Sequence, residues 1–538
     1  MRARERASVT RARIRRFSDR CFGVDPRSLA AFRIGLGAVL LLDLLLRARN
    51  LRTFYTDEGI LPVALLADQF PTLARLSLHA RSGEALFQAL LFAVALAAAL
   101  ALLVGYRTKF ATGVSLCLLL SLHARNPYVL SGADALLQHL LFWTLFVPVG
   151  ERWSVDAQLG GAGRERIARE RIVSVGTVAL LSQVLVVYGV NAILKARSDA
   201  WMSGDAVSVI LSLDHFAVFL APALRELPAV LWLANWAWVG LLLASPLLVL
   251  TTGRTRIALV GAFAGMHLGM LLTMSLEIFP LVSVVALLPF LPEGVWDSLG
   301  GNRRIARLKD GVSRSAAPLY SRLPAGSLDF LPPRIGRCRG TLARTVATLV
   351  LVGVLAFNAT ALGLVPVPAV TDDAGATADS TGSTADSTGA TADGNGGVAD
   401  PIAAVSDLTA AVADADPRWT MFAPHPPAND RWYVAPGELA SGERVDAFGR
   451  EELRWERPDA LAGSYSSPRM RKYLSNVRGD ERLLSSFADH LCSQWSRDRE
   501  GDLETVAVYE VTAPSHAVGE DSRDRTELVR TACDERAT

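Results

Sequence analysis

The chain has 538 residues, of which 51% are hydrophobic and 20% are charged, and its formal net charge is +2. Soluble domains carry about 25% charged residues, and the apolar excess here lies in long uninterrupted runs. This composition excludes a disordered, collagenous or disulfide-framework protein, and a net charge this small argues against a nucleic-acid partner.

Nine apolar runs predict a polytopic α-helical membrane bundle of about nine spans, because about 20 apolar residues cross the hydrocarbon core. The runs cover residues 29–46, 84–104, 110–123, 133–149, 172–194, 228–250, 257–275, 277–292 and 345–366. We therefore expect an Arg-rich N-terminus at 1–29, a transmembrane domain at 30–300, a basic loop at 301–344 and a last transmembrane helix at 345–366. Residues 1–29 contain no apolar core followed by a cleavage site, so we expect no cleaved signal peptide.

The distribution of basic residues predicts the orientation. With a cytoplasmic N-terminus, the expected cytoplasmic segments hold 28 Lys+Arg and the external segments hold 9, as the positive-inside rule requires. Residues 371–538 contain 31 acidic and 17 basic side chains, a net charge of −14, whereas the remainder carries +16. Such asymmetry often indicates membrane contact. We expect a multi-pass protein of the cell membrane, in contact with the lipid bilayer, whose acidic C-terminal part lies outside.

Residues 371–400 repeat the unit Ala-Asp-Ser-Thr-Gly and contain no aromatic residue, so we expect a disordered acidic linker. Residues 401–538 predict a small external α+β domain with a hairpin, a helix and a strand. The hairpin is expected from 431–434 and 444–448, the helix at 483–495 and the strand at 504–511. The sequence does not identify a protein partner for this domain.

Cys492 and Cys533 both lie in the expected external domain, where a disulfide can persist; one buried and one exposed thiol is the alternative. Cys21, Cys117 and Cys338 have no metal-ligand spacing. We expect no metal site.

Charged side chains inside apolar runs are costly and need a partner or a role. In the first run, Asp43 has Arg47 one helical turn on, which predicts a helix-end salt bridge, and Arg33 is expected to extend towards the cytoplasmic interface. His267 lies in the middle of a run and is either a packing or a functional histidine. Glu277 lies in a short turn, either solvated or facing a cavity.

A polar segment runs from His123 to His139. Pro127 and Gly132 interrupt the helical pattern there, and Asp134 begins the next run, where a carboxylate favours the helix dipole. Gln138 follows on the same face. The residues alone favour a capped turn.

Lys195 is one of only four lysines among 55 basic residues. Tyr188, Asn191 and Lys195 recur at helical spacing and share a face. Desolvation disfavours the charged form of a lysine, so Lys195 is a candidate base. The alternative is an interfacial lysine that extends to the headgroups.

Several motifs in order resemble the horizontally transferred transmembrane (HTTM) family, whose best-known relative is the vitamin K-dependent γ-carboxylase. They are Phe32–Gly37, Phe54–Pro62, the motif Trp153-Ser154-Val155-Asp156, Tyr188–Lys195 followed by Trp201, and Leu213–Phe216. The resemblance covers about residues 25–300. The segment from Trp419 to Pro427 also resembles the tail that follows this domain in prokaryotic members.

The resemblance implies that Lys195 is the base that deprotonates a quinol, which oxygen then converts to an epoxide. It also suggests a membrane quinol such as menaquinol as the substrate. Candidate cavity residues are Tyr188, Asn191, Asn126, Asp134, His123 and His267. In the carboxylase, a histidine that assists carboxylation follows the asparagine matching Asn126. Here that position is Pro127, so the resemblance leaves open whether carbon dioxide is added.

Two hypotheses follow. The first is a carboxylase-like enzyme that oxidises a membrane quinol with Lys195 as base. The second is a non-catalytic membrane anchor that presents the external domain. A transporter would require inverted repeats or paired broken helices, and the sequence shows neither.

Overall fold

The computed structural model describes residues 17–159, 171–300, 333–361, 421–450, 452–499, 501–515 and 523–533. The expected linker at 371–400, most of the basic loop at 301–344, residues 1–16 and Trp419 lie outside these ranges. We refer to residues 17–361 as the membrane part and to residues 421–533 as the C-terminal domain.

The membrane part is built from helices, and every predicted apolar run contains one. The longer helices are α2 (Pro26–Ala48), α6 (Ala85–Val104), α7 (Thr108–Arg125), α8 (Gly132–Thr144), α10 (Val175–Ala196), α14 (Pro228–Leu243), α16 (Gly253–Thr273), α17 (Phe279–Leu287) and α20 (Pro333–Ala361). The shorter ones are α3 (Leu51–Tyr55), α4 (Val63–Gln69), α5 (Pro71–Leu76), η1 (Pro127–Val129), α9 (Val155–Leu159), α11 (Asp199–Ser203), α12 (Ala206–Ser212), α13 (Ala221–Arg225), α15 (Leu247–Leu250), η2 (Leu288–Phe290) and α18 (Glu293–Gly300).

The expected count of nine spans is not confirmed. Within the described residues, four helices are long and apolar enough to cross a membrane, namely α2, α6, α10 and α16. A fifth span is possible if the bent pair at 279–290 and 293–300 counts as one. The other apolar runs form helices that do not meet this test of length and hydropathy; α14, for example, has only 16 residues.

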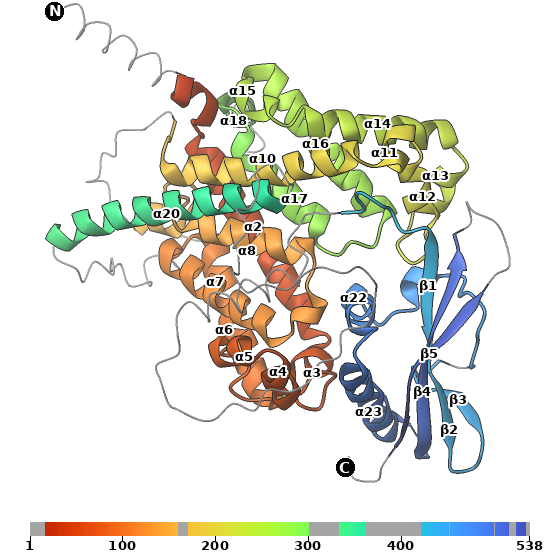
Figure 1. The fold of residues 1–538 in the computed structure, drawn as a ribbon. Helices are drawn as coiled ribbons and strands as arrows, with labels where there is room; N and C mark the ends of the chain where they lie inside the picture. Colours follow the sequence, from red (N-terminus) through yellow and green to blue (C-terminus); the bar gives the residue numbers. More distant parts are fainter. Residues whose placement is uncertain are drawn as a thin grey trace, which may run out of the picture.

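The helices of the membrane part pack around α2 and α10. Helix α2 packs against α6 and α17, and α10 packs against α8 and α14. In Figure 1 α2 crosses the direction of α10, and the C-terminal domain lies at one end of the membrane part. The buried side of α2 consists mainly of aliphatic and aromatic side chains such as Phe32, Leu36 and Leu40.

The C-terminal domain is an antiparallel sheet with two helices on one face. Its strands are β1 (Asn429–Val434), β2 (Pro436–Leu439), β3 (Arg444–Asp446), β4 (Leu503–Pro514) and β5 (Asp524–Ala532). The long strand β4 pairs with β1 and β2 and also with β5. Helices α22 (Pro468–Val477) and α23 (Glu481–Asp498) lie between the sheet and the membrane part (Figure 1), and η3 (Leu461–Gly463) precedes them.

The predicted helix and strand of this domain are present as α23 and β4, but the predicted hairpin is wrong. Strand β1 pairs with β4, so that Trp432 lies opposite Val511. The hairpin partner of β3 is β2, where Gly437 lies opposite Val445. A single extended residue, Ala435, separates β1 from β2, so the short β2 is hard to distinguish from β1 in the sequence.

Local sequence signals position the helices that carry the polar residues. Ser131 and Asp134 form a capping box at the start of α8, which satisfies backbone N–H groups at the helix end. Helix α22 begins with Ser467 as N-cap and Pro468 in its first turn, a common helix start. These caps fix Asp134 and Arg469 near their helix N-termini.

Four loops of the membrane part contact the C-terminal domain. They are the segments that the arginine distribution places outside: 47–83, 124–132, 195–227 and the turn near Ser275. The contacts include Gln69 to Asp480 at 2.8 Å, Asn476 to the carbonyl of Tyr128 at 2.7 Å and Arg471 to the carbonyls of His215 and Ser275. These four loops therefore lie at one end of the helices.

Candidate functional site

A cavity of about 590 Å³ lies between the membrane part and the C-terminal domain. We call it the interdomain cavity. Helices α8, α10, α12, α14, α16 and α17 form one side, and β1, α22 and the segment Met421–Phe422 form the other. Most of its walls are apolar side chains. Its size and composition match sites that bind small ligands, which measure roughly 300–1,000 Å³.

Lys195 lies in the wall of this cavity, near the end of α10. Its side chain is only 1% exposed. The amine donates a hydrogen bond to the carbonyl oxygen of Met421 at 2.8 Å and lies 4.0 Å from the ring centroid of Trp201. The amine is therefore enclosed by protein, whereas the alternative of an interfacial lysine requires it to extend to the headgroups.

Trp201 joins the same contact to the C-terminal domain. Its indole N–H donates to the carbonyl oxygen of Phe422 at 2.9 Å. Consecutive carbonyls, from Met421 and Phe422, thus accept hydrogen bonds from two residues that the sequence singled out. Both carbonyls belong to the segment from Trp419 to Pro427 that resembles the family tail, and Met421, Phe422 and Pro427 of this segment line the cavity.

Tyr188 on α10 and His267 on α16 form a polar pair in the cavity wall. Tyr188 lies seven residues before Lys195. Seven residues of helix span about 10 Å. The Tyr188 hydroxyl lies 3.1 Å from Nε2 of His267, and the Tyr188 ring stacks on Phe263 with centroids 4.5 Å apart. His267 Nδ1 has no hydrogen-bond partner among the described residues. Asn191 also lines the cavity and bonds to the carbonyl of Val187.

The other three candidate cavity residues lie elsewhere. Asn126 is buried and donates to the carbonyl of Phe54 at 3.0 Å. His123 contacts Arg47 and Gln138, at 3.3 and 3.1 Å. Neither of them, nor Asp134, is among the cavity-lining residues of the described chain. His123 and Asp134 face a buried ion cluster instead.

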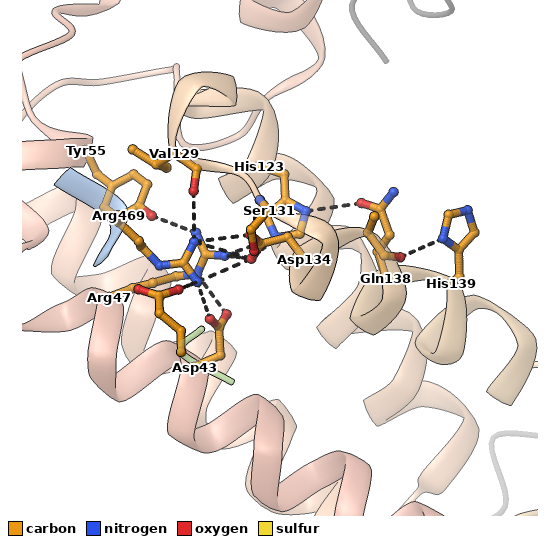
Figure 2. Close-up of polar contacts among 12 residues, drawn as sticks. Asp43, Arg47, Tyr55, His123, Val129, Ser131, Asp134, Gln138, His139 and Arg469 are labelled. Carbon is orange, nitrogen blue, oxygen red and sulfur yellow. Dashed lines mark hydrogen bonds and ion pairs between the residues drawn. The ribbon is translucent and has the colours of Figure 1, made fainter. Parts of the chain in front are cut away.

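This carboxylate–arginine cluster consists of Asp43, Arg47, Asp134, Glu277 and Arg469. Arg47 pairs with Asp43 at 2.7 Å, as expected from their spacing, and with Asp134. Arg469 reaches in from α22 and lies 2.8 Å from Asp43, 3.3 Å from Asp134 and 3.2 Å from Glu277. Figure 2 shows the two guanidinium groups side by side, with Asp43 and Asp134 around them.

Glu277 and Arg469 connect the cluster to the cavity, because both also line it. Glu277 has a backbone φ of 51°, a left-handed conformation that is uncommon for residues other than glycine. Burial raises the pKa of the Glu277 carboxyl above its ordinary value, and the charge of Arg469 opposes this change. The sequence identified Glu277 as a residue of interest but gave no indication that Arg469 would contact it.

His215 and Asp430 make a further contact between the two parts. Nδ1 of His215 lies 2.7 Å from a carboxylate oxygen of Asp430. Burial lowers the pKa of His215, while the hydrogen bond that the imidazole donates to Asp430 opposes this effect. A neutral imidazole that donates its Nδ1–H to an ionised carboxylate fits this arrangement.

The motif at Trp153–Asp156 has a structural position far from the cavity. The Asp156 carboxylate accepts the backbone N–H groups of Arg107 and Thr108 at 2.7 and 2.8 Å, and so caps the start of α7. The Ser154 hydroxyl donates to the carbonyl of Gly150. The Trp153 ring packs edge-on against Trp296.

Arg33 also belongs to this end of the molecule. It is fully buried and donates to the carbonyls of Leu102, at 2.8 Å, and Trp153, at 2.6 Å. The expectation that it extends to the interface is therefore wrong: backbone carbonyls at the ends of α6 and of the 145–153 loop satisfy its charge inside the protein.

Cys492 and Cys533 are joined in a disulfide that links α23 to the residue after β5, with their Cα atoms 5.6 Å apart. Cys21 and Cys117 are free thiols. Among the described residues, no group of three or more His, Cys, Asp or Glu side chains is arranged to hold a metal ion.

The apolar helices and their buried polar network define an integral membrane protein. Comparison with protein families adds the particular family: the model for the HTTM domain matches residues 23–296, just over half of the chain. The chain belongs to the HTTM family. Searches of curated proteins and of solved structures found no match.

Proposed function

We propose that this HTTM-family protein is a membrane enzyme that oxidises a quinol, with Lys195 as the base and menaquinol as the candidate substrate. One observation carries the proposal: the Lys195 amine lies in the wall of a largely apolar cavity of about 590 Å³. Arg47 and Arg469 pair with carboxylates, whereas no ion pair within the described ranges includes Lys195. Its amine contacts a carbonyl and an aromatic face instead.

The proposed chemistry requires a neutral amine at Lys195. Such an amine can donate one N–H to Met421 and still accept a hydroxyl proton with its lone pair. Removal of that proton leaves a quinolate, which dioxygen oxidises. In the overall reaction, quinol and dioxygen give epoxide and water: one oxygen atom bridges two ring carbons, and the other leaves as water with the two hydroxyl protons.

The lining of the cavity suits a substrate with an apolar ring, which the bilayer would supply. Aromatic and aliphatic side chains such as Trp238, Leu231 and Phe279 line it, so that they can exclude water from a bound ring. Tyr188 and His267 add a hydrogen-bonding pair deeper in the cavity. We assign these two residues to orienting the substrate, and Lys195 to proton transfer.

Three observations support a site on the external side of the membrane. The arginine distribution places the N-terminus inside, and all four predicted external loops contact the C-terminal domain. The disulfide between Cys492 and Cys533 fits an oxidising compartment. We propose a cytoplasmic N-terminus and an external C-terminal domain.

A second candidate function is a non-catalytic anchor. Its support is the set of buried ion pairs through which the membrane part holds the C-terminal domain, such as Asp43 with Arg469. An anchor that presents a binding domain, however, does not need a cavity between the two parts, so we favour the enzyme. In cells, the anchor predicts that removal of residues 401–538 reproduces the deletion phenotype, while Lys195→Ala is silent.

The enzyme proposal is tested in purified membranes supplied with reduced menaquinone and oxygen. We expect epoxide from the wild type and none from Lys195→Ala at equal protein level. Absence of epoxide from the folded wild type with several quinols would remove the support for quinol oxidation and favour the anchor.

A further inference from the structure

The site around Lys195 is shared between two parts of the chain, although the family match ends at residue 296. We propose that the C-terminal domain is an integral part of this site and that Arg469 is the positioning residue that seats it. The catalytic significance of this inference rests on the proposed function, whereas the contacts themselves do not.

The charges of the cluster provide the first argument. The membrane part contributes three carboxylates, from Asp43, Asp134 and Glu277, but only one guanidinium, from Arg47. Arg469 is only 4% exposed and pairs with all three carboxylates. Without it, two buried carboxylate charges would lack a compensating guanidinium, and uncompensated buried charge is strongly unfavourable. Docking of the C-terminal domain therefore lowers the excess of carboxylates over guanidiniums in the cluster from two to one.

Tyr55 and His123 also face the cluster. The Tyr55 hydroxyl accepts a hydrogen bond from Arg47 at 2.8 Å, and His123 lies 3.7 Å from Asp134. Its Nδ1 contacts Gln138 and its Nε2 contacts Arg47. As a neutral imidazole it adds no positive charge, so Arg469 remains the side chain that supplies the second cation.

A continuous series of contacts runs from α22 to Lys195. Arg471, two residues after Arg469, donates to the carbonyls of His215 and Ser275 and lies 4.3 Å from the ring centroid of Phe216. The Phe216 ring packs edge-on against Phe422, with centroids 5.1 Å apart. The Phe422 carbonyl accepts from Trp201, and the preceding carbonyl, of Met421, accepts from Lys195.

Seating of α22 therefore determines what surrounds the Lys195 amine. With the domain docked, the amine is held between the Trp201 ring and the Met421 carbonyl, beside the cavity. With the domain displaced, both the carbonyl and the cavity wall would be lost, and a lysine at the end of α10 would extend towards water. The C-terminal domain thus holds the amine in place and closes the cavity around it.

Lysine labelling tests this inference without turnover, because the chain has only four lysines. Full-length protein in detergent is treated with acetic anhydride, and the modification rate of each lysine is measured by mass spectrometry. We expect Arg469→Ala to accelerate labelling of Lys195 about tenfold, because labelling follows the population of the opened state. Lys109, which lies at the opposite end of α7 from Asn126 and donates to carbonyls near Val147, is the internal reference and is expected to keep its rate.

Two further variants make the test specific. Arg469→Lys retains the cation and is expected to restore much of the protection. Arg478→Ala, in the same domain, removes a half-exposed partner of Glu510 and should leave Lys195 protected. If Arg469→Ala does not fold, Phe422→Ala removes the aromatic contact to Phe216 and is expected to expose Lys195 in the same way.

An unchanged labelling rate of Lys195 in a folded Arg469→Ala or Phe422→Ala variant would overturn the inference. Epoxide assays on the same samples separate it from the proposed function. Faster labelling without epoxide from the wild type would support the shared site and reject quinol oxidation. Epoxide from the wild type with labelling that is independent of Arg469 would do the reverse.

Discussion

A guanidinium nitrogen of Arg469 lies 2.8 Å from a carboxylate oxygen of Asp43, although the two residues are 426 positions apart in the chain. The ion pair joins the first membrane helix to the C-terminal domain and is buried between them. It makes the two ends of the chain parts of one structural unit.

A double-mutant cycle with Arg469→Ala and Asp43→Asn measures the energetic coupling of this pair. We expect a coupling of about 0.5–3 kcal/mol, as found for residues in one network, and a loss of about 3–5 kcal/mol for Arg469→Ala alone, because it leaves buried carboxylates unpaired. Thermal or denaturant unfolding of the full-length protein in detergent measures both. Additive effects of the two substitutions would show that the pair is not energetically linked.

Glu277 predicts a dependence of stability on pH. Burial raises the pKa of its carboxyl in the folded protein above its ordinary value, so the folded state binds a proton more tightly than the unfolded state. Stability contributed by this group is therefore full below the ordinary pKa of about 4.3 and is lost as pH rises through the folded pKa. We expect Glu277→Gln to gain stability relative to wild type as pH rises from 4 to 7. A difference in melting temperature that does not change with pH would contradict this.

The disulfide between Cys492 and Cys533 closes a loop across a sequence separation of 41. We expect Cys533→Ser to destabilise the C-terminal domain by about 2–4 kcal/mol. Thiol alkylation of intact cells, before and after reduction, tests whether the bond forms. Free alkylation of both residues without reductant would argue against the external location of this domain.

Orientation has its own test. A tag fused to the C-terminus should be removed by protease added to intact cells, whereas a tag at the N-terminus should be protected until the membrane is opened. Resistance of the C-terminal tag would reverse the proposed topology, and with it the proposal that the cavity faces outward.

The hydrogen bond between Tyr188 and His267 gives a prediction within the cavity. Tyr188→Phe keeps the ring stacked on Phe263 but removes the hydroxyl 3.1 Å from the imidazole. We expect a loss of about 1–3 kcal/mol in stability, because it leaves a buried nitrogen unpaired. We also expect weaker quinol binding, seen as a raised KM. Unchanged stability and KM would remove this pair from the site.

Local pattern was sufficient for the parts of the fold that depend on nearby residues. The spacing of Asp43 and Arg47 predicted their salt bridge. The spacing of Tyr188, Asn191 and Lys195 predicted that they share one face of a helix, and in the structure all three line the interdomain cavity. The number of spans was not predictable in this way, since the length of an apolar run does not give the length of the helix that forms within it: the run at 133–149 contains α8, which ends at Thr144.

Contacts between distant segments were beyond the sequence. Arg469 lies in an amphipathic helix rich in basic residues, where an arginine is usually expected to be solvated. No residue near it in the sequence indicates that it pairs with three carboxylates of the membrane part. Strand β1 likewise pairs with β4, whose residues lie 75 to 85 positions later, rather than with the neighbouring strand. Asp134 and His123 were correctly singled out as polar residues of interest, but the cluster that they face could be identified only from the fold.

Chemical rescue tests the role of Lys195 as base most directly. Epoxide formation from menaquinol is measured for wild type, Lys195→Ala and Lys195→Arg, with and without small primary amines. Our account predicts that Lys195→Ala is inactive, that added amines restore activity to it in proportion to their basicity, and that Lys195→Arg stays inactive although it keeps the positive charge. Full activity of a folded Lys195→Arg variant, or of Lys195→Ala without amine, would contradict it.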